Sequence, residues 1–338
     1  MNETQDRAGT LRETARQMLA DDKGLLAMDE SNPTCNKRFA ALGIPQTVEM
    51  RRAYRDLIVA TPRLAESVGG AILYDETIRQ QAHDGTPFAR ALERAGIIAG
   101  IKVDEGARPL ALHEGELVTE GLDGLRDRLA EYAGMGARFA KWRAVITIAE
   151  ERGHPSDACI GANAHALARY AALCQEAGIV PIVEPEVLMD GGHPIERCAE
   201  VTERTLACVF AQLRGQGVAF DGMVLKPNMV VPGLKCLRQV TPDEVADATI
   251  EVFRRTVPAA VAGIAFLSGG QSAEDATARL AAMNRRWRGR LPWPVAFSFA
   301  RAIQDPAMRA WGGHAENVQA AQRALEERAR ANREARRA

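Results

Sequence analysis

The sequence predicts a (β/α)8 barrel, because eight short apolar runs alternate with helical segments and almost every run ends in a polar residue. Short apolar runs bounded by Gly, Pro and polar residues are typical of buried strands. The residues at their ends lie 27 to 46 positions apart, which is the spacing of a strand followed by a helix. These end residues are Asp29, Asp75, Lys102, Lys141, Glu184, Lys226, Ser268 and Ser298.

The length and composition suit one barrel domain. The chain has 338 residues, 46% of them hydrophobic, and an α/β barrel commonly uses this length as one domain. We therefore expect residues 1–338 to form a single barrel domain with an N-terminal capping helix (residues 6–20) and a C-terminal helical tail. The predicted strands are 23–30, 69–76, 97–104, 137–143, 179–186, 222–229, 263–270 and 292–301.

Capping signals support several of the helices between these strands. Thr47 is predicted as an N-cap and Gly178 as the stop of a long helix. The last helix ends in a run of Arg, Ala and Glu, which predicts a solvated, fraying helix face. The predicted helices are 46–61, 87–95, 122–133, 156–177, 195–214, 241–256, 272–284 and the chain from residue 306 onward.

A doubly wound open sheet is the alternative fold for such a pattern. That fold would place a G-x-G-x-x-G loop after the first strand, where this chain has Asp29-Glu-Ser-Asn-Pro-Thr. No linker or change of composition divides the chain. The barrel is therefore preferred.

Composition argues against several classes of protein. The formal net charge of −1 gives no global field that would favour nucleic acid or membrane, and no apolar run approaches the roughly 18 residues of a membrane span. Residues 1–20 are polar and fit neither a signal nor a transit peptide. The six cysteines form no C-x-x-C pair, so we expect reduced, mostly buried thiols in a cytoplasmic protein.

The polar residues at the strand ends can act together. Residues two apart on a strand share a face, so Lys141 and Arg143 point the same way, as do Glu184 and Glu186. In a barrel such faces converge on one mouth, where function gathers. The expected set is Asp29, Lys102, Lys141, Arg143, Glu184, Glu186 and Lys226.

This set favours Schiff-base chemistry. A lysine crowded by other cations and partly desolvated has a lowered pKa, and its free amine can attack a carbonyl. The carboxylates can then serve as acid and base. A salt-bridge lattice that merely closes the barrel is the alternative. It would explain any single pair, but seven groups from five strands favour catalysis.

The last two strands predict a phosphate site. The sequence Ser268-Gly269-Gly270 leads directly into a helix, and Ser298 and Arg301 arrive from the eighth strand. Barrels often hold phosphate in the loops after strands seven and eight. Arg38 follows strand one and could hold a second phosphate. The six histidines form no paired-ligand pattern, so no metal or other cofactor is expected.

These residues resemble class I (Schiff-base) fructose-1,6-bisphosphate aldolases. The resemblance rests on seven segments that span all but the two ends of the chain. They are LAMDES (26–31), GIKVD (100–104), FAKWR (139–143), IVEPE (182–186), LKPNM (225–229), LSGGQ (267–271) and WGG (311–313). It implies reversible cleavage of fructose-1,6-bisphosphate to dihydroxyacetone phosphate and glyceraldehyde-3-phosphate in glycolysis and gluconeogenesis, without metal, by a homo-oligomer that is usually tetrameric.

The resemblance also implies a role for each matching residue. Lys226 matches the Schiff-base lysine, Glu184 the general acid/base, and Asp29 the group that takes the C4 hydroxyl proton. The other matches are Glu186 and Lys141 in the proton network, Ser268, Gly269, Gly270, Ser298 and Arg301 at the ketone-half phosphate, and Arg38, Lys102 and Arg143 around the other phosphate and the sugar hydroxyls.

Two features depart from the family pattern. The glycine that commonly precedes the strand-eight arginine is Ala300, which would narrow that phosphate pocket. The usual C-terminal tail ending in tyrosine is missing, since the last tyrosine is Tyr170. We therefore expect the tail from residue 332 onward to be dispensable for chemistry.

Two alternative functions remain open from sequence. One is a related Schiff-base aldolase that acts on sedoheptulose-1,7-bisphosphate, and the other is a non-catalytic binding scaffold. Intact Lys226, Glu184 and Asp29 argue against the scaffold, because such a charge cluster is costly to bury. No nucleic-acid or membrane partner is expected.

Overall fold

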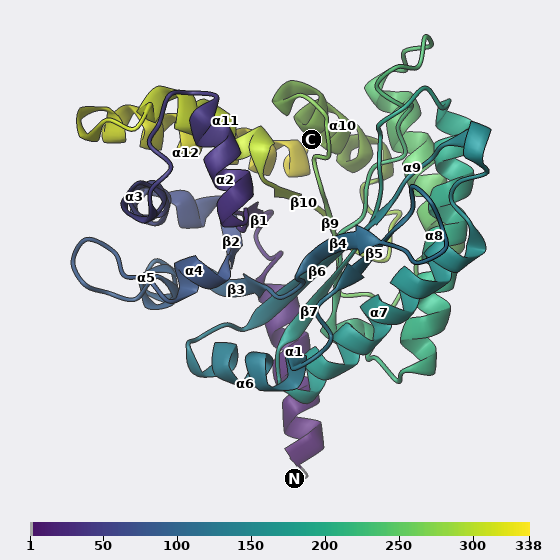
Figure 1. Ribbon diagram of the computed structural model, residues 1–338, viewed down its shortest axis with the longest axis horizontal. Coiled ribbons are helices and arrows are strands. Elements are labelled where there is room, and N and C mark those ends of the chain that lie inside the picture. Colours follow the sequence, from purple (N-terminus) through teal and green to yellow (C-terminus); the bar gives the residue numbers. More distant parts are fainter. Residues whose placement is uncertain (1–2) are drawn as a thin grey trace.

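A computed structural model describes residues 3–338 and contains a closed barrel of parallel strands, seen obliquely near the centre of Figure 1. The strand order around the barrel is β1-β10-β9-β8-β7-β6-β3-β2. The predicted (β/α)8 barrel is therefore confirmed. The barrel strands are β1 (Gly24–Ala27), β2 (Val68–Leu73), β3 (Ile98–Lys102), β6 (Phe139–Ile146), β7 (Val180–Val187), β8 (Val224–Leu225), β9 (Ile264–Phe266) and β10 (Val295–Phe299).

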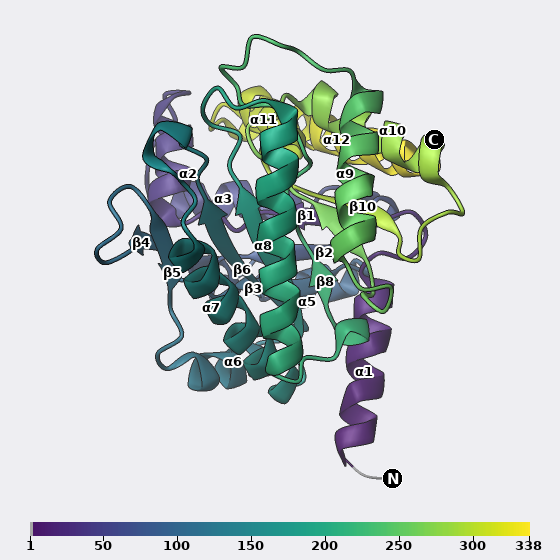
Figure 2. The same cartoon turned by 90° about the vertical axis from the view of Figure 1, so that its right-hand side faces the viewer.

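Helices surround this barrel, with the long α7, α8 and α9 along one side (Figures 1 and 2). Thr47 caps α3 by accepting a hydrogen bond from Met50 N, and α7 ends just before Gly178, as predicted. The α-helices are α1 (Glu3–Gln17), α2 (Asn32–Ala40), α3 (Val48–Val59), α4 (Asp75–Ile78), α5 (Phe88–Arg94), α6 (Leu125–Gly134), α7 (Asp157–Glu176), α8 (Ile195–Gly215), α9 (Pro242–Thr256), α10 (Ala273–Trp287), α11 (Arg301–Trp311) and α12 (Val318–Arg337).

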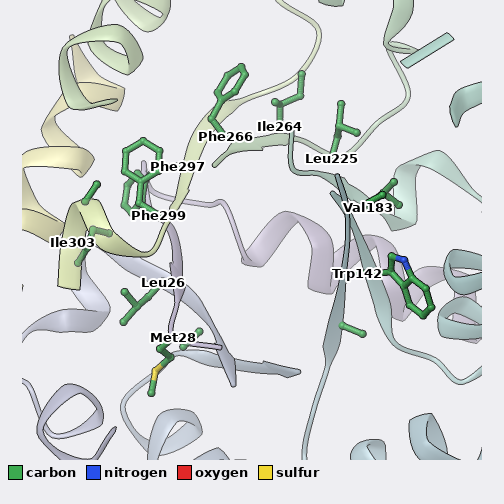
Figure 3. Packing of buried hydrophobic residues seen from close by; sticks show 14 of the residues in the cluster. Leu26, Met28, Trp142, Val183, Leu225, Ile264, Phe266, Phe297, Phe299 and Ile303 are labelled. Carbon is green, nitrogen blue, oxygen red and sulfur yellow. The ribbon is translucent and has the colours of Figure 1, made fainter. Parts of the chain in front are cut away.

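The two faces of each strand bury different sets of apolar side chains. Residues that point outward pack against the helices (Figure 3). Trp142 of β6, for example, lies with its ring centroid 5.5 Å from that of Tyr170 on α7. The inward residues form a separate cluster inside the barrel, with members Leu25, Ala27, Ile72, Phe139, Val180, Ile182, Val224, Ala265 and Ala296.

The Phe139 ring of β6 packs in the barrel interior against two glycines, Gly100 of β3 and Gly70 of β2. A Cβ atom added to Gly100 would lie 2.2 Å from Phe139 Cε2, and one added to Gly70 would lie 3.0 Å from Phe139 Cε1. Real side chains do not approach so closely, so an alanine at position 100 would displace the ring.

Helix α1 covers the end of the barrel where the strands begin. Leu11, Ala15 and Met18 pack into the interior cluster, as the predicted capping helix requires. At this end Gly69 approaches the Met18 carbonyl so closely that an added Cβ would lie 2.3 Å from the oxygen. The opposite end, where the strands finish, is left open for polar side chains.

Several elements differ from the sequence prediction. Strand β8 has only two residues, because Pro227 has no N–H to continue the ladder. Helix α11 begins at Arg301, so Pro306 lies inside it rather than starting it. The prediction also missed α2 and an antiparallel hairpin of β4 (Gly106–Pro109) and β5 (Leu117–Glu120).

The prediction of a solvated, fraying tail is wrong. Asn332 is fully buried on α12, and its Oδ1 accepts a hydrogen bond of 2.8 Å from Thr277 Oγ1. Arg336 is 8% exposed and donates to the carbonyls of Leu19 and Val295. The run of charged residues gave no sign of this burial. Long charged side chains can bury their aliphatic stems while their polar ends donate hydrogen bonds to backbone carbonyls.

Two further observations concern the described residues. Four of the six free cysteines (Cys35, Cys159, Cys174 and Cys198) are buried, and the other two are partly buried, which agrees with the expected buried thiols. Between residues 3 and 338, no helix combines the length and the apolar composition needed to cross a membrane.

Candidate active site

The site lies at the open end of the barrel and continues the inward-facing rows of the strands. Two positions after the interior residue Ala27 comes Asp29, and two positions after Ile182 comes Glu184. The same step leads from Phe139 to Lys141 and from Val224 to Lys226. Period-two alternation therefore aims these side chains into one mouth, a cavity of ≈ 450 Å³.

Four buried charged groups form a continuous chain across the mouth. Lys226 Nζ lies 3.0 Å from Glu184 Oε1, and Lys141 Nζ lies 3.2 Å from Glu184 Oε2. Lys141 Nζ also lies 2.8 Å from Asp29 Oδ2. Glu184 Oε2 accepts no aligned hydrogen bond within residues 3–338, so it is available to exchange a proton with a bound molecule.

Burial and ion pairing have opposite effects on the pKa values of Asp29 and Lys141 in this row of charged groups. Burial alone would raise the pKa of Asp29, but the ammonium groups of Lys141 and Lys226 outweigh it and lower the pKa to about 2. Burial alone would lower the pKa of Lys141, but Asp29 and Glu184 raise it well above its ordinary value. Asp29 is therefore a carboxylate and Lys141 an ammonium at neutral pH.

Two further pairs complete the cationic side of the mouth. Arg143 Nε lies 2.5 Å from Glu186 Oε2, and the Arg143 side chain is 43% exposed. Lys102 Nζ lies 2.7 Å from Asp104 Oδ1. Both cations line the cavity, as the sequence predicted. Asp104 was not predicted as a site residue, although it lies two positions after Lys102 and so shares its face.

The ends of β9 and β10 contribute small polar groups to the cavity. Gly269 has a φ of +57°, a left-handed conformation that favours glycine. Arg301 donates a hydrogen bond to the Gly269 carbonyl, and the buried Ser298 Oγ has no partner among the described residues. Ser268, Gly269, Ser298, Ala300 and Arg301 line the cavity directly.

Gly270 lies just behind this lining. Its N–H points to Met189 Sδ, 3.2 Å away, and Ser272 caps helix α10 two residues later. The predicted phosphate residues are therefore together in space, with Gly270 the one that does not line the cavity.

Arg38 reaches the mouth from helix α2. Its guanidinium pairs with Glu30, and its Nη2 lies 2.8 Å from Asp305 Oδ1. Glu30 also pairs with Arg55, 2.8 Å away, and accepts a hydrogen bond of 2.9 Å from Gln304 Nε2. Burial would raise the pKa of Glu30, but Arg55 and Arg38 lower it. Glu30 therefore stays ionised and fixes Arg38.

The sequence prediction missed further parts of this lining, among them Glu30, the segment 105–107 and Tyr74. Glu30 lies next to Asp29, but its partners come from α2, α3 and α11, so sequence offers no signal for it. The segment 105–107 lines the cavity through the unpredicted hairpin. Tyr74 directly follows β2, and its position two after the inward Ile72 could have indicated it.

Comparison with known proteins decides the family. The model of the class-I fructose-bisphosphate aldolase family matches residues 10–338. The chain belongs to the class-I fructose-bisphosphate aldolase family. It is a carbon–carbon lyase of the Schiff-base class, and the family resemblance found in the sequence is confirmed.

Relatives and a solved structure agree with this assignment. A probable class 1 fructose-bisphosphate aldolase from Xanthomonas campestris is 55% identical over 95% of this chain and 96% of its own length. A Drosophila melanogaster fructose-bisphosphate aldolase is 50% identical over 95% of this chain and 88% of its own. A crystal structure of the Plasmodium falciparum aldolase, in complex with TRAP and an inhibitor, has a TM-score of 0.96 and 45% identity, and the match covers 98% of this chain and 95% of that one.

Proposed function

We propose that Lys226 forms the Schiff base through which this aldolase cleaves fructose-1,6-bisphosphate. The supporting observation is the buried chain Lys226–Glu184–Lys141–Asp29, in which each ammonium touches a carboxylate. Lys226 is nearly buried and lines the cavity, so a substrate carbonyl can reach its nitrogen without bulk water. Glu184 lies close enough to exchange protons with that nitrogen.

The proposed reaction runs in four balanced steps. Glu184 takes a proton from the Lys226 ammonium, the free amine attacks the C2 carbonyl, and Glu184 returns the proton as the carbinolamine loses water. Asp29 then takes the C4 hydroxyl proton, the C3–C4 bond breaks, and its electron pair moves into the iminium to form an enamine. Glyceraldehyde-3-phosphate leaves, a fixed residue or water protonates the enamine at C3 to restore the iminium, and the proton on Asp29 returns to that donor. Water then adds to the iminium and releases dihydroxyacetone phosphate and the Lys226 ammonium.

The remaining residues bind and orient the substrate in this proposal. Lys141 and Glu186 hold the charges of the proton network in place. Ser268, Gly269, Gly270, Ser298 and Arg301 receive the phosphate of the ketone half, where Ser298 Oγ has no other partner among the described residues. Arg38, Lys102 and Arg143 receive the other phosphate and the sugar hydroxyls. All but Gly270 line one cavity.

Trapping the intermediate tests this function. Incubation with dihydroxyacetone phosphate and borohydride should inactivate the protein by reducing the iminium at Lys226, and peptide mapping should find the label there alone. A label on Lys141 or Lys102, or no label in protein that cleaves the sugar, would contradict the mechanism. Turnover on sedoheptulose-1,7-bisphosphate, compared with fructose-1,6-bisphosphate, measures the substrate preference.

Assembly and location complete the proposal. We propose that residues 1–338 act as one domain, that the protein is a homotetramer as is usual for the family, and that it works in the cytoplasm. A relative from Arabidopsis thaliana, described as cytosolic, is 50% identical over 93% of this chain and 86% of its own length. Sedimentation equilibrium and cell fractionation test these statements.

A further inference from the structure

Tyr74 lines the mouth of the barrel, and its hydroxyl has no hydrogen-bond partner among residues 3–338. Its side chain is partly exposed and lines the cavity together with Asp29 and Lys102. The chain has four tyrosines. In the part of the chain that the structure describes, Tyr74 is the only one whose hydroxyl makes no hydrogen bond.

The other three tyrosine hydroxyls are used inside the protein. Tyr54 donates to Gln304, Tyr132 donates to Asp75, and Tyr170 donates to the Ile182 carbonyl. A phenol usually finds a protein partner when its ring is buried. The Tyr74 hydroxyl is therefore left available for a bound molecule.

Strand register places Tyr74 among the charged groups of the mouth. Leu73 pairs with Ile101 across β2 and β3, so the next residue, Tyr74, lies beside Lys102. Ala27 pairs with Ile72 across β1 and β2, so Tyr74 also lies level with Asp29. Parallel neighbours at one level point to the same face, and Tyr74 follows the interior residue Ile72 by two positions.

The position of β2 in the barrel indicates which half of the substrate Tyr74 meets. In the order of the strands β2 lies opposite β8, which leads directly to Lys226, and away from the phosphate loop after β9. Its neighbours β1 and β3 lead to Asp29 and Lys102. Under the proposed function these residues meet the C4 hydroxyl and the second phosphate, which leave with the aldehyde product.

We propose that Tyr74 is a substrate-contacting residue whose hydroxyl donates a hydrogen bond to an oxygen of the aldehyde half, and so contributes to specificity for a phosphorylated aldehyde. This inference rests on the proposed function, because it assumes that the ketone half is held at Lys226. Burial, with the nearby carboxylates of Asp75, Glu76 and Asp104, raises the pKa of Tyr74. The hydroxyl therefore stays protonated and able to donate at neutral pH.

Kinetics in the direction of synthesis test the proposal. Loss of one neutral hydrogen bond reduces affinity by about 2- to 12-fold. In Tyr74→Phe we therefore expect the KM for glyceraldehyde-3-phosphate to rise about fivefold. The KM for dihydroxyacetone phosphate and the rate of proton exchange on it should stay unchanged. Tyr132→Phe, which removes a hydroxyl bonded outside the mouth, is the matched control and should leave both constants unchanged.

The outcomes separate this inference from the function on which it rests. Absence of borohydride trapping in the wild-type protein would overturn the proposed function itself. Normal trapping with an unchanged KM for glyceraldehyde-3-phosphate in Tyr74→Phe would overturn only the role of Tyr74. A similar rise in both KM values, together with slower proton exchange, would show that Tyr74 has only a structural role. That result would also overturn the proposal.

Discussion

The carboxylate of Glu184 lies 3.0 Å from the ammonium nitrogen of Lys226. Both groups are buried, so the contact is little screened by water. Glu184 is therefore the carboxylate nearest to the nitrogen that the proposed mechanism converts to an iminium. Its second oxygen accepts no aligned hydrogen bond within the described chain.

The first prediction concerns this contact. Glu184→Gln removes the proton donor but keeps the shape of the side chain, so kcat should fall about 10²- to 10⁴-fold. Borohydride trapping with dihydroxyacetone phosphate should slow in parallel, because loss of water from the carbinolamine becomes limiting. Glu203→Gln is a suitable control, since Glu203 pairs with Arg255 on the outer surface. A normal trapping rate in Glu184→Gln would assign the acid to another group.

The second prediction concerns Arg301. Arg301→Ala removes a charge-assisted bond worth about 1.5–3 kcal/mol, so the Kd for dihydroxyacetone phosphate should rise roughly tenfold or more. Calorimetric titration measures this constant directly. Arg309→Ala changes an exposed arginine on the same helix and should leave the Kd unaltered. A Kd that is equal in both variants would place the phosphate elsewhere.

Sequence reasoning found the barrel and the inward-facing site residues for one physical reason. Period-two alternation is local, so Lys141 and Glu184 could be assigned to the mouth from their own strands. The structure brings these two side chains within 3.2 Å, as convergence at a barrel end requires. The sequence could not give the pairing itself, because it depends on how strands far apart in the chain are packed.

The features that sequence analysis did not predict depend on contacts between residues far apart in the chain. Glu30 lies next to a predicted residue, but its importance comes from Arg55 and Gln304, 25 and 274 residues away. The sequence pattern placed Arg336 in a solvated charged run, yet its guanidinium donates hydrogen bonds to backbone carbonyls 313 to 317 residues away. The local sequence pattern cannot reveal such contacts, since an arginine in a charged run looks the same in the sequence whether its side chain is exposed or buried.

The third prediction concerns metal independence. Residues 3–338 contain no cluster of three or more His, Cys, Asp or Glu side chains arranged to hold a metal ion. The proposed mechanism stabilises charge with the iminium of Lys226 instead. Prolonged treatment with EDTA should therefore leave cleavage of fructose-1,6-bisphosphate unchanged, whereas a loss that zinc restores would contradict it.

The fourth prediction concerns the pH dependence of stability. In the unfolded chain the pKa of Asp29 is about 3.9, whereas in the folded protein burial is outweighed by Lys141 and Lys226 and the pKa falls to about 2. A depressed folded pKa stabilises the protein above the unfolded pKa, and this stabilisation is lost as the pH falls through the folded value. The difference in free energy of unfolding between wild type and Asp29→Asn should therefore be constant above about pH 5 and shrink between about pH 4 and pH 2.

Urea denaturation at several pH values measures this difference. The matched control is Asp157→Asn, because Asp157 is almost fully exposed where it pairs with Arg204. The control should show little difference at any pH. A difference for Asp29→Asn that stays constant down to pH 2 would show that Asp29 is not held as a carboxylate by the buried lysines.

The last prediction concerns the end of helix α12. The expectation that residues 332–338 are dispensable concerns chemistry alone and stays a prediction, whereas the fold uses these residues, because Asn332 and Arg336 are buried against the barrel and α10. Arg336→Met leaves the Leu19 and Val295 carbonyls without a donor, and each such group costs about 1–3 kcal/mol. We expect the free energy of unfolding in urea to fall by at least about 2 kcal/mol, with kcat of the folded protein unchanged. Arg330→Ala, which alters an exposed arginine of the same helix, should be near neutral. Equal stability of the two variants would mean that the Arg336 contacts contribute nothing, and a loss of kcat at full stability would mean that this helix acts on the site.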